Sequence, residues 1–169
     1  MTSSPSLQPV DPVDYLKQTH DSYAALGYDP YRWAHNPEPS AIVALDKPLS
    51  ECKVALIASG GVYKVGQVAF THKDDLSFRA VPNTTENADL RVTHFAFDQT
   101  KARNDPGVVF PLAALRALVN DGTIGSLTSH ALTFMGGIYS QRKLKETLLP
   151  ALVDQVQEME ADIVLLVPV

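Results

Sequence analysis

The sequence contains a single cysteine, Cys52, among 169 residues. One thiol cannot form an internal disulfide, and it excludes a zinc site built from four cysteines. The sequence also lacks an apolar run near the roughly 20 residues that a membrane-spanning helix needs. Its first residues carry neither the basic nor the apolar segment of a secretory signal. These absences predict a cytoplasmic protein that does not enter a membrane.

Basic side chains are also scarce. The chain has 14 lysines and arginines against 19 aspartates and glutamates, which gives a formal charge of −5. A net negative chain offers no broad basic surface for phosphate backbones, so the charge argues against nucleic-acid binding. Apolar residues, by contrast, make up 45% of the sequence. A chain of this length and composition can build one domain with a substantial core.

Proline divides the chain into two parts, because seven of the twelve prolines lie within residues 1–50. We predict that this part is a proline-rich arm with one helix, which Asp11 caps and Gly27 ends. Residues 51–169 are predicted to form the domain. Three aromatic residues follow the predicted helix: Tyr28, Tyr31 and Trp33. Because such rings need a surface to cover, the arm is expected to wrap around the domain or a partner subunit.

Beyond residue 50, short apolar runs alternate with helical patterns. Strands are predicted at residues 53–58, 77–81, 91–97, 130–135 and 162–169. Helices are predicted at residues 111–122 and from Ser140 onward, with a kink or break at Pro150. This order predicts a three-layer α/β fold, a mainly parallel sheet with flanking helices. The continuous apolar runs are typical of strands buried on both faces.

Two glycine turns follow predicted strands. Gly60 and Gly61 follow Ser59 after the first strand, and Gly136 and Gly137 follow another. In open α/β sheets the ligand crevice lies outside the carboxyl ends of the strands, so both turns are expected there. Their backbone N–H groups could bind an anion, although ordinary tight turns explain the glycines equally well. Neither turn matches a phosphate-binding loop or a dinucleotide-binding fingerprint.

Polar side chains between the strands offer further candidates. His94 and Asp98 could form a pair that tunes a general base, or the histidine could serve only structure. Arg79 could clamp a carboxylate, or form an internal salt bridge with Asp74 or Asp75. No spacing in the sequence matches a standard metal site, so no metal is predicted.

Several short motifs also occur in a defined order. They are Gly61-Val62, Asp75–Arg79, Val81–Thr85, Thr93-His94 with Asp98, Asp105, Phe110-Pro111, Leu115-Arg116 and Phe134–Gly137. In this order the chain resembles the selenoprotein B family of glycine, sarcosine, betaine and D-proline reductases. The resemblance covers about Lys53 to Val169 and is closest to short, stand-alone relatives of the D-proline reductase selenoprotein subunit.

The resemblance implies an oxidoreductase that cleaves a carbon–nitrogen bond reductively or cycles a selenol with a thiol. In the family, the strand that corresponds to Asp162–Val169 leads into a redox loop with selenocysteine or cysteine. This sequence stops before such a residue, and selenocysteine is encoded by UGA. We therefore expect a reading frame cut short at its selenocysteine codon, and a chain that is inactive by itself and exposes apolar surface.

The resemblance also assigns roles and partners. His94 and Asp98 would be catalytic, and the substrate-binding residues would be Gly60, Gly61, Arg79, Gly136 and Gly137. The chain itself would carry no cofactor, whereas a partner subunit could carry a pyruvoyl group. A small-molecule substrate, a reductase partner subunit or thioredoxin-like reductant, and a homo- or hetero-oligomer are implied. Two alternatives stay open: a small-anion or nucleotide-binding module, and a non-catalytic subunit of a larger complex.

Overall fold

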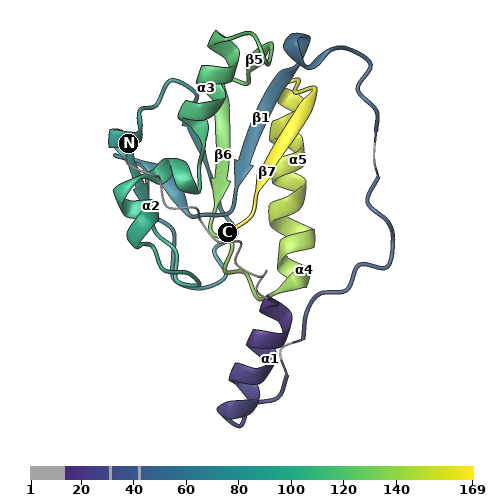
Figure 1. The fold of residues 1–169 in the computed structure, drawn as a ribbon, viewed down its shortest axis with the longest axis vertical. Helices are drawn as coiled ribbons and strands as arrows, with labels where there is room; N and C mark the ends of the chain where they lie inside the picture. The colour runs from purple at the N-terminus through teal and green to yellow at the C-terminus, as the bar shows by residue number, and fades with distance from the viewer. Residues whose placement is uncertain (1–13, 31, 42) are drawn as a thin grey trace, which may run out of the picture. The chain divides into compact units, whose positions relative to one another are not determined.

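The computed structural model describes residues 14–30, 32–41 and 43–169. The chain divides into two compact units, Met1–Ala41 and Ile42–Val169. Figure 1 shows the elements of both units. In the described part of the chain, no helix combines the length and the apolar composition that crossing a bilayer requires.

The first unit contains the helix α1 (Tyr15–Ala25). Its N-cap is Asp14, which accepts a hydrogen bond from the backbone N–H of Lys17 at 3.0 Å. The predicted cap, Asp11, lies outside the described residues. The predicted end is confirmed, since Gly27 follows the helix at a φ of +75°.

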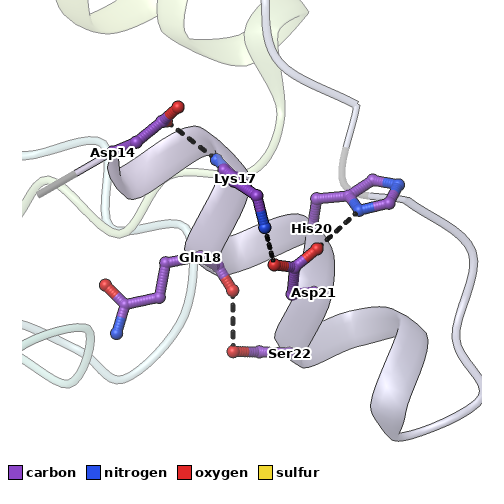
Figure 2. A network of polar contacts seen from close by, with 6 residues as sticks. All are labelled: Asp14, Lys17, Gln18, His20, Asp21 and Ser22. Carbon is purple, nitrogen blue, oxygen red and sulfur yellow. Dashed lines mark hydrogen bonds and ion pairs between the residues drawn. The ribbon is translucent and has the colours of Figure 1, made fainter.

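Polar contacts connect residues along α1, as Figure 2 shows. Lys17 forms an ion pair with Asp21 one turn later. The Nδ1 atom of His20 lies 3.4 Å from a carboxylate oxygen of Asp21, and the Ser22 hydroxyl donates to the carbonyl of Gln18. No residue of α1 is buried. These contacts between exposed groups support the helix locally but add little to its stability.

The second unit is a five-stranded sheet with helices and a smaller two-stranded sheet. The large sheet contains β1 (Lys53–Ala58), β3 (Phe78–Pro82), β5 (Ser126–Leu127), β6 (His130–Phe134) and β7 (Ile163–Val167). The small sheet pairs β2 (Val62–Lys64) with β4 (Leu90–Val92). The helices are α2 (Thr100–Asn104), α3 (Leu112–Asn120), α4 (Gln141–Lys143) and α5 (Leu149–Glu158).

Strand β1 lies at the centre of the large sheet. It pairs in parallel with β5 and β6 along one edge and with β7 along the other, as the registers require. The sheet is mixed rather than wholly parallel: β1 pairs in parallel with three strands, as the predicted mainly parallel sheet requires, but β3 runs antiparallel to β6. Two parallel strands need a crossover connection, which is usually a helix. Only β2 and loops connect β1 to β3, so β3 enters the sheet in the opposite direction.

Helices cover both faces of this sheet. On one face, Val54 and Leu56 belong to a buried cluster with Leu112 of α3. On the other face, Ile57 belongs to a second cluster with Leu152 of α5. The alternation along β1 confirms the prediction that this run is buried on both faces.

The strand predicted at residues 91–97 is much shorter in the structure. Strand β4 ends at Val92 and pairs only with β2 among the described residues. Beyond it, the Nδ1 atom of His94 accepts the backbone N–H of Ala96 at 3.0 Å, which replaces a ladder bond. His94 therefore lies in a loop rather than in a strand.

The helix that follows Ser140 is irregular close to Pro150, where the sequence predicts a kink or break. The Ser140 hydroxyl caps α4 by accepting the backbone N–H of Lys143. A π-helical segment, Leu144–Leu148, then joins α4 to α5. Pro150 falls in the first turn of α5, where its missing N–H costs least.

Strand β7 differs from its prediction in burial. The apolar run predicts a strand covered on both faces, but Leu165 and Leu166 are exposed over 39% and 66% of their surface. The reason is its place in the sheet, since β7 pairs with β1 alone in the part that the structure describes. It is an edge strand with the composition of an interior one.

Candidate functional site

The carboxyl ends of β1, β6 and β7 meet at one edge of the sheet (Figure 1). The turns that follow β1 and β6 are joined by hydrogen bonds. The N–H of Gly136 donates to the carbonyl of Ser59 at 2.8 Å, and the N–H of Gly61 donates to the carbonyl of Phe134 at 2.9 Å. We call this place, formed by Ser59–Gly61 and Met135–Gly137, the strand-end crevice, after the position at which open α/β sheets bind ligands.

The last residues of the chain also reach the strand-end crevice. The N–H of Ser59 donates to the carbonyl of Val167 at 3.1 Å, and the Ser59 hydroxyl accepts the N–H of Val169 at 2.9 Å. A Cβ on Gly60 would lie 3.3 Å from a methyl carbon of Val169. Ser59 was not among the predicted site residues, although its place directly after a buried strand was a usable signal.

The glycines of the strand-end crevice allow neighbouring segments of the chain to approach their Cα atoms closely. A Cβ on Gly61 would lie 2.0 Å from the carbonyl oxygen of Thr93, and its φ is +67°. A Cβ on Gly137 would lie 2.9 Å from the ring of Phe95. The backbone N–H groups of Gly61, Gly136 and Gly137 already donate to Phe134, Ser59 and the sulfur of Met135. An anion could not use these three donors without a change in the turns.

His94 lies beside the strand-end crevice. The N–H of Thr93 donates to the carbonyl of Gly61 at 2.9 Å, and a Cβ on Gly61 would lie 3.6 Å from the Cβ of His94. The histidine is only 3% exposed and packs against Phe97, with 4.8 Å between ring centroids. Burial lowers its pKa below the ordinary value, which favours the neutral ring.

The hydrogen bonds of His94 define its tautomer. Because Nδ1 accepts a hydrogen bond from Ala96, the proton of the neutral ring is on Nε2. That Nε2 atom is buried and has no partner among the described residues. His94 thus carries a buried donor that is unsatisfied.

We predict that His94 stays neutral, with its proton on Nε2, at pH 7. A ¹⁵N NMR titration of the ring nitrogens should show this tautomer and a pKa below the 6.5 of a free histidine. A His94 ring that carries two protons at pH 7 would contradict the assignment.

Asp98, the predicted partner of His94, makes other contacts. Its carboxylate accepts the hydroxyl and the backbone N–H of Thr100, and these two bonds lower its pKa. No hydrogen bond or ion pair between Asp98 and His94 occurs in the described ranges. The carboxylate therefore binds the first backbone N–H of α2 from the position before the N-cap, Gln99. Its catalytic role stays a prediction.

Arg79 is held by the loop that precedes β3. Its guanidinium donates to the carbonyls of Val68, Ala69 and Phe78 and to the hydroxyl of Ser77. It also lies 4.3 Å from the centroid of the Phe70 ring. The alternative prediction, a salt bridge between Arg79 and Asp74 or Asp75, is not seen among the residues that the structure describes. The substrate-binding role of Arg79 stays a prediction.

The neighbouring aspartates hold the same loop. Buried Asp75 accepts hydrogen bonds from the backbone N–H and the hydroxyl of both Thr71 and Ser77. Asp74 accepts the N–H groups of Tyr139 and Ser140. Together they connect the loop before β3 to the start of α4.

Metal ligands do not gather anywhere in the parts that the structure describes, where no group of three or more His, Cys, Asp or Glu could hold an ion. Cys52 is fully buried before β1, at the opposite end of that strand from the strand-end crevice. Its thiol contacts the carbonyl of Pro48 at 3.4 Å.

Comparison with known proteins identifies the family. A family model described as glycine/sarcosine/betaine reductase selenoprotein B matches residues 36–168. The chain belongs to this family. The resemblance drawn from the ordered motifs is therefore confirmed, and the match includes Ser59–Gly61, His94 and Met135–Gly137.

One curated protein is similar to this chain over most of the chain's length. The chain is 31% identical to D-proline reductase subunit gamma of Acetoanaerobium sticklandii over 128 residues. The matched region is 76% of this chain and 53% of the relative, so the chain spans about half the length of that relative. No solved structure matches the chain.

Proposed function

We propose that the chain is the α/β scaffold of a selenoprotein B-type oxidoreductase whose reactive selenol or thiol acts at the strand-end crevice. One observation carries the proposal: the residues after β7 lie against Ser59, and the Ser59 hydroxyl accepts the N–H of Val169 at 2.9 Å. A residue joined to Val169 would emerge beside Ser59 and Gly60. That is the edge where α/β sheets place their ligands.

The reactive atom of this proposal is not the chain's own thiol. Cys52 precedes β1 and is buried with 0% exposure, so it cannot reach a substrate at the other end of the strand. The family resemblance implies a nucleophile in a loop after the strand that corresponds to β7, and in this proposal it is a selenocysteine or cysteine joined directly after Val169.

The proposed chemistry is a two-electron reduction. Cleaving a carbon–nitrogen bond by reduction takes up two electrons and two protons, giving one new C–H and one new N–H bond. A selenol and the thiol of a second cysteine, which the family resemblance implies a few residues later in the redox loop, supply these by forming one Se–S bond. A thioredoxin-like dithiol restores the pair while becoming a disulfide. The fold contributes the position of the nucleophile.

His94 contributes a neutral donor in this proposal. Because its proton is on Nε2 and its pKa is lowered by burial, the ring adds no positive charge beside Gly61 at pH 7. The buried N–H can donate a hydrogen bond to a substrate atom or to the selenolate when the loop at residues 93–97 gives that atom access to the ring.

A pyruvoyl group, which the sequence resemblance implies, belongs to a partner subunit in this proposal. The glycine N–H groups at the strand-end crevice donate to protein atoms, so this face of the chain is not arranged to hold a carbonyl group. The relative's name describes a subunit, which supports a complex with partner chains.

The nucleotide sequence that follows codon 169 tests the proposal. We expect UGA followed by further open frame. The chain continued through that frame, with cysteine as residue 170, should react with iodoacetamide at that residue and form a disulfide that a dithiol reduces. The same chain with serine at residue 170 is the control. A gene that closes at codon 169, or a 169-residue chain that reduces a substrate unaided, would overturn the proposal.

A further inference from the structure

An apolar groove of about 610 Å³ lies between α5 and β7. Its walls include Leu149, Leu152, Val153, Val156, Val164 and Leu166, and it extends to Ser59 and Pro168. None of its lining residues is charged. Several of them are open to solvent, with Leu149, Val153 and Leu166 exposed over 42%, 51% and 66% of their surface. The groove therefore presents apolar surface at the edge of the sheet.

The outer edge of β7 carries none of the usual protection of an edge strand. Natural edges are blunted by charges, proline or bulges, because their free N–H and C=O groups pair with other chains. The five residues of β7 are all apolar and uncharged, and proline appears only after the strand, at Pro168. This is the composition of a strand with neighbours on both sides.

We propose that a further β-strand, from the part of the family fold that this chain does not span, pairs with the outer edge of β7 and fills the groove. The chain spans 53% of its curated relative, so a protein of that length has residues available for this role. The occupant has apolar side chains at alternate positions, because Val164 and Leu166 face the groove with the period of a strand. The inference rests on the proposed function for its source of the strand.

A second copy of the chain fits this edge less well. Two β7 strands that pair antiparallel about Leu165 would place Asp162 of one copy opposite Pro168 of the other. Asp162 is ion-paired with Lys47 at 2.7 Å and also accepts the N–H of Lys53. The pairing would therefore bring a charged cluster against the apolar end of the groove.

Hydrogen–deuterium exchange tests the inference. The 169-residue chain is compared with the chain continued through its downstream frame, with cysteine as residue 170. We expect the amides of Ile163–Val167 to exchange at least tenfold more slowly in the continued chain. Leu166→Lys in that chain should restore fast exchange. Val65→Lys, at a site that is 52% exposed in the turn after β2, is the matched control and should change nothing.

Other outcomes overturn the inference. Equal exchange in the two chains would show that no strand is added to β7. Protection in the 169-residue chain that disappears on dilution and with Leu166→Lys would assign the edge to a second copy. The absence of a downstream frame would remove the proposed source. Alkylation of residue 170 reports on the proposed function separately, so a reactive thiol with unprotected β7 amides would defeat only this inference.

Discussion

Replacing Gly61 with alanine is expected to destabilise the second unit by on the order of 3–5 kcal/mol. Two effects add at this position. The φ of +67° is strained for a residue with a side chain, and the new Cβ would lie 2.0 Å from the carbonyl oxygen of Thr93. Backbone cannot move aside as a flexible side chain can, so the turn beside His94 must shift. Urea unfolding followed by circular dichroism measures the loss.

Gly66 and Gly122 separate the two effects. Both have positive φ, +94° and +78°, but a Cβ on either would meet nothing within 4 Å. Alanine at these positions should therefore cost only the strain of the left-handed conformation, about 1 kcal/mol. A Gly61→Ala variant as stable as Gly66→Ala would contradict the close approach between Gly61 and Thr93.

Replacing Asp75 with alanine is expected to cost roughly 2–4 kcal/mol. The carboxylate is 7% exposed and accepts four hydrogen bonds from Thr71 and Ser77. Its loss leaves these donors without their acceptor and frees the loop that Arg79 contacts. Thermal unfolding of the variant measures the change. Asp121→Ala is the control, because this exposed carboxylate only accepts from Thr123 at the end of α3 and should cost less than about 1 kcal/mol.

The Asp75 contribution should also depend on pH. Burial acts to raise the pKa of Asp75, but the hydrogen bonds from Ser77 and Thr71 outweigh it and hold the pKa below 3.8. A carboxyl whose pKa is lower in the folded state stabilises the protein above its unfolded pKa and loses this contribution as the pH falls through the folded value. Unfolding curves between pH 5 and pH 2 should thus converge for the wild type and Asp75→Ala. Parallel curves would show that ionised Asp75 is not what holds the loop.

Local patterns predicted the elements whose signals lie within a few neighbouring residues. The apolar run of β1 and the glycines after β1 and β6 set a buried strand and two turns, and the structure has both. The cap at Ser140 and the disturbance near Pro150 were predicted for the same reason. In each case a residue's own backbone freedom or missing donor decides the outcome.

The contacts of the candidate site depended on distant residues. Sequence spacing suggested that His94 pairs with Asp98, but His94 packs on Phe97 and its Nδ1 accepts from Ala96. Arg79 binds carbonyls of its own loop rather than a nearby aspartate. Several partners were in reach of each polar side chain, and spacing alone does not choose between them.

By itself the sequence determined the α/β class, the turns at the strand ends and, through ordered motifs, the selenoprotein B family. Only the tertiary structure decided that the sheet is mixed, that Ser59 joins Val169 at the strand-end crevice, and that β7 lies at an edge. The reason is physical. Burial patterns record which residues avoid water, whereas the order of strands in a sheet depends on pairing between segments far apart in the chain.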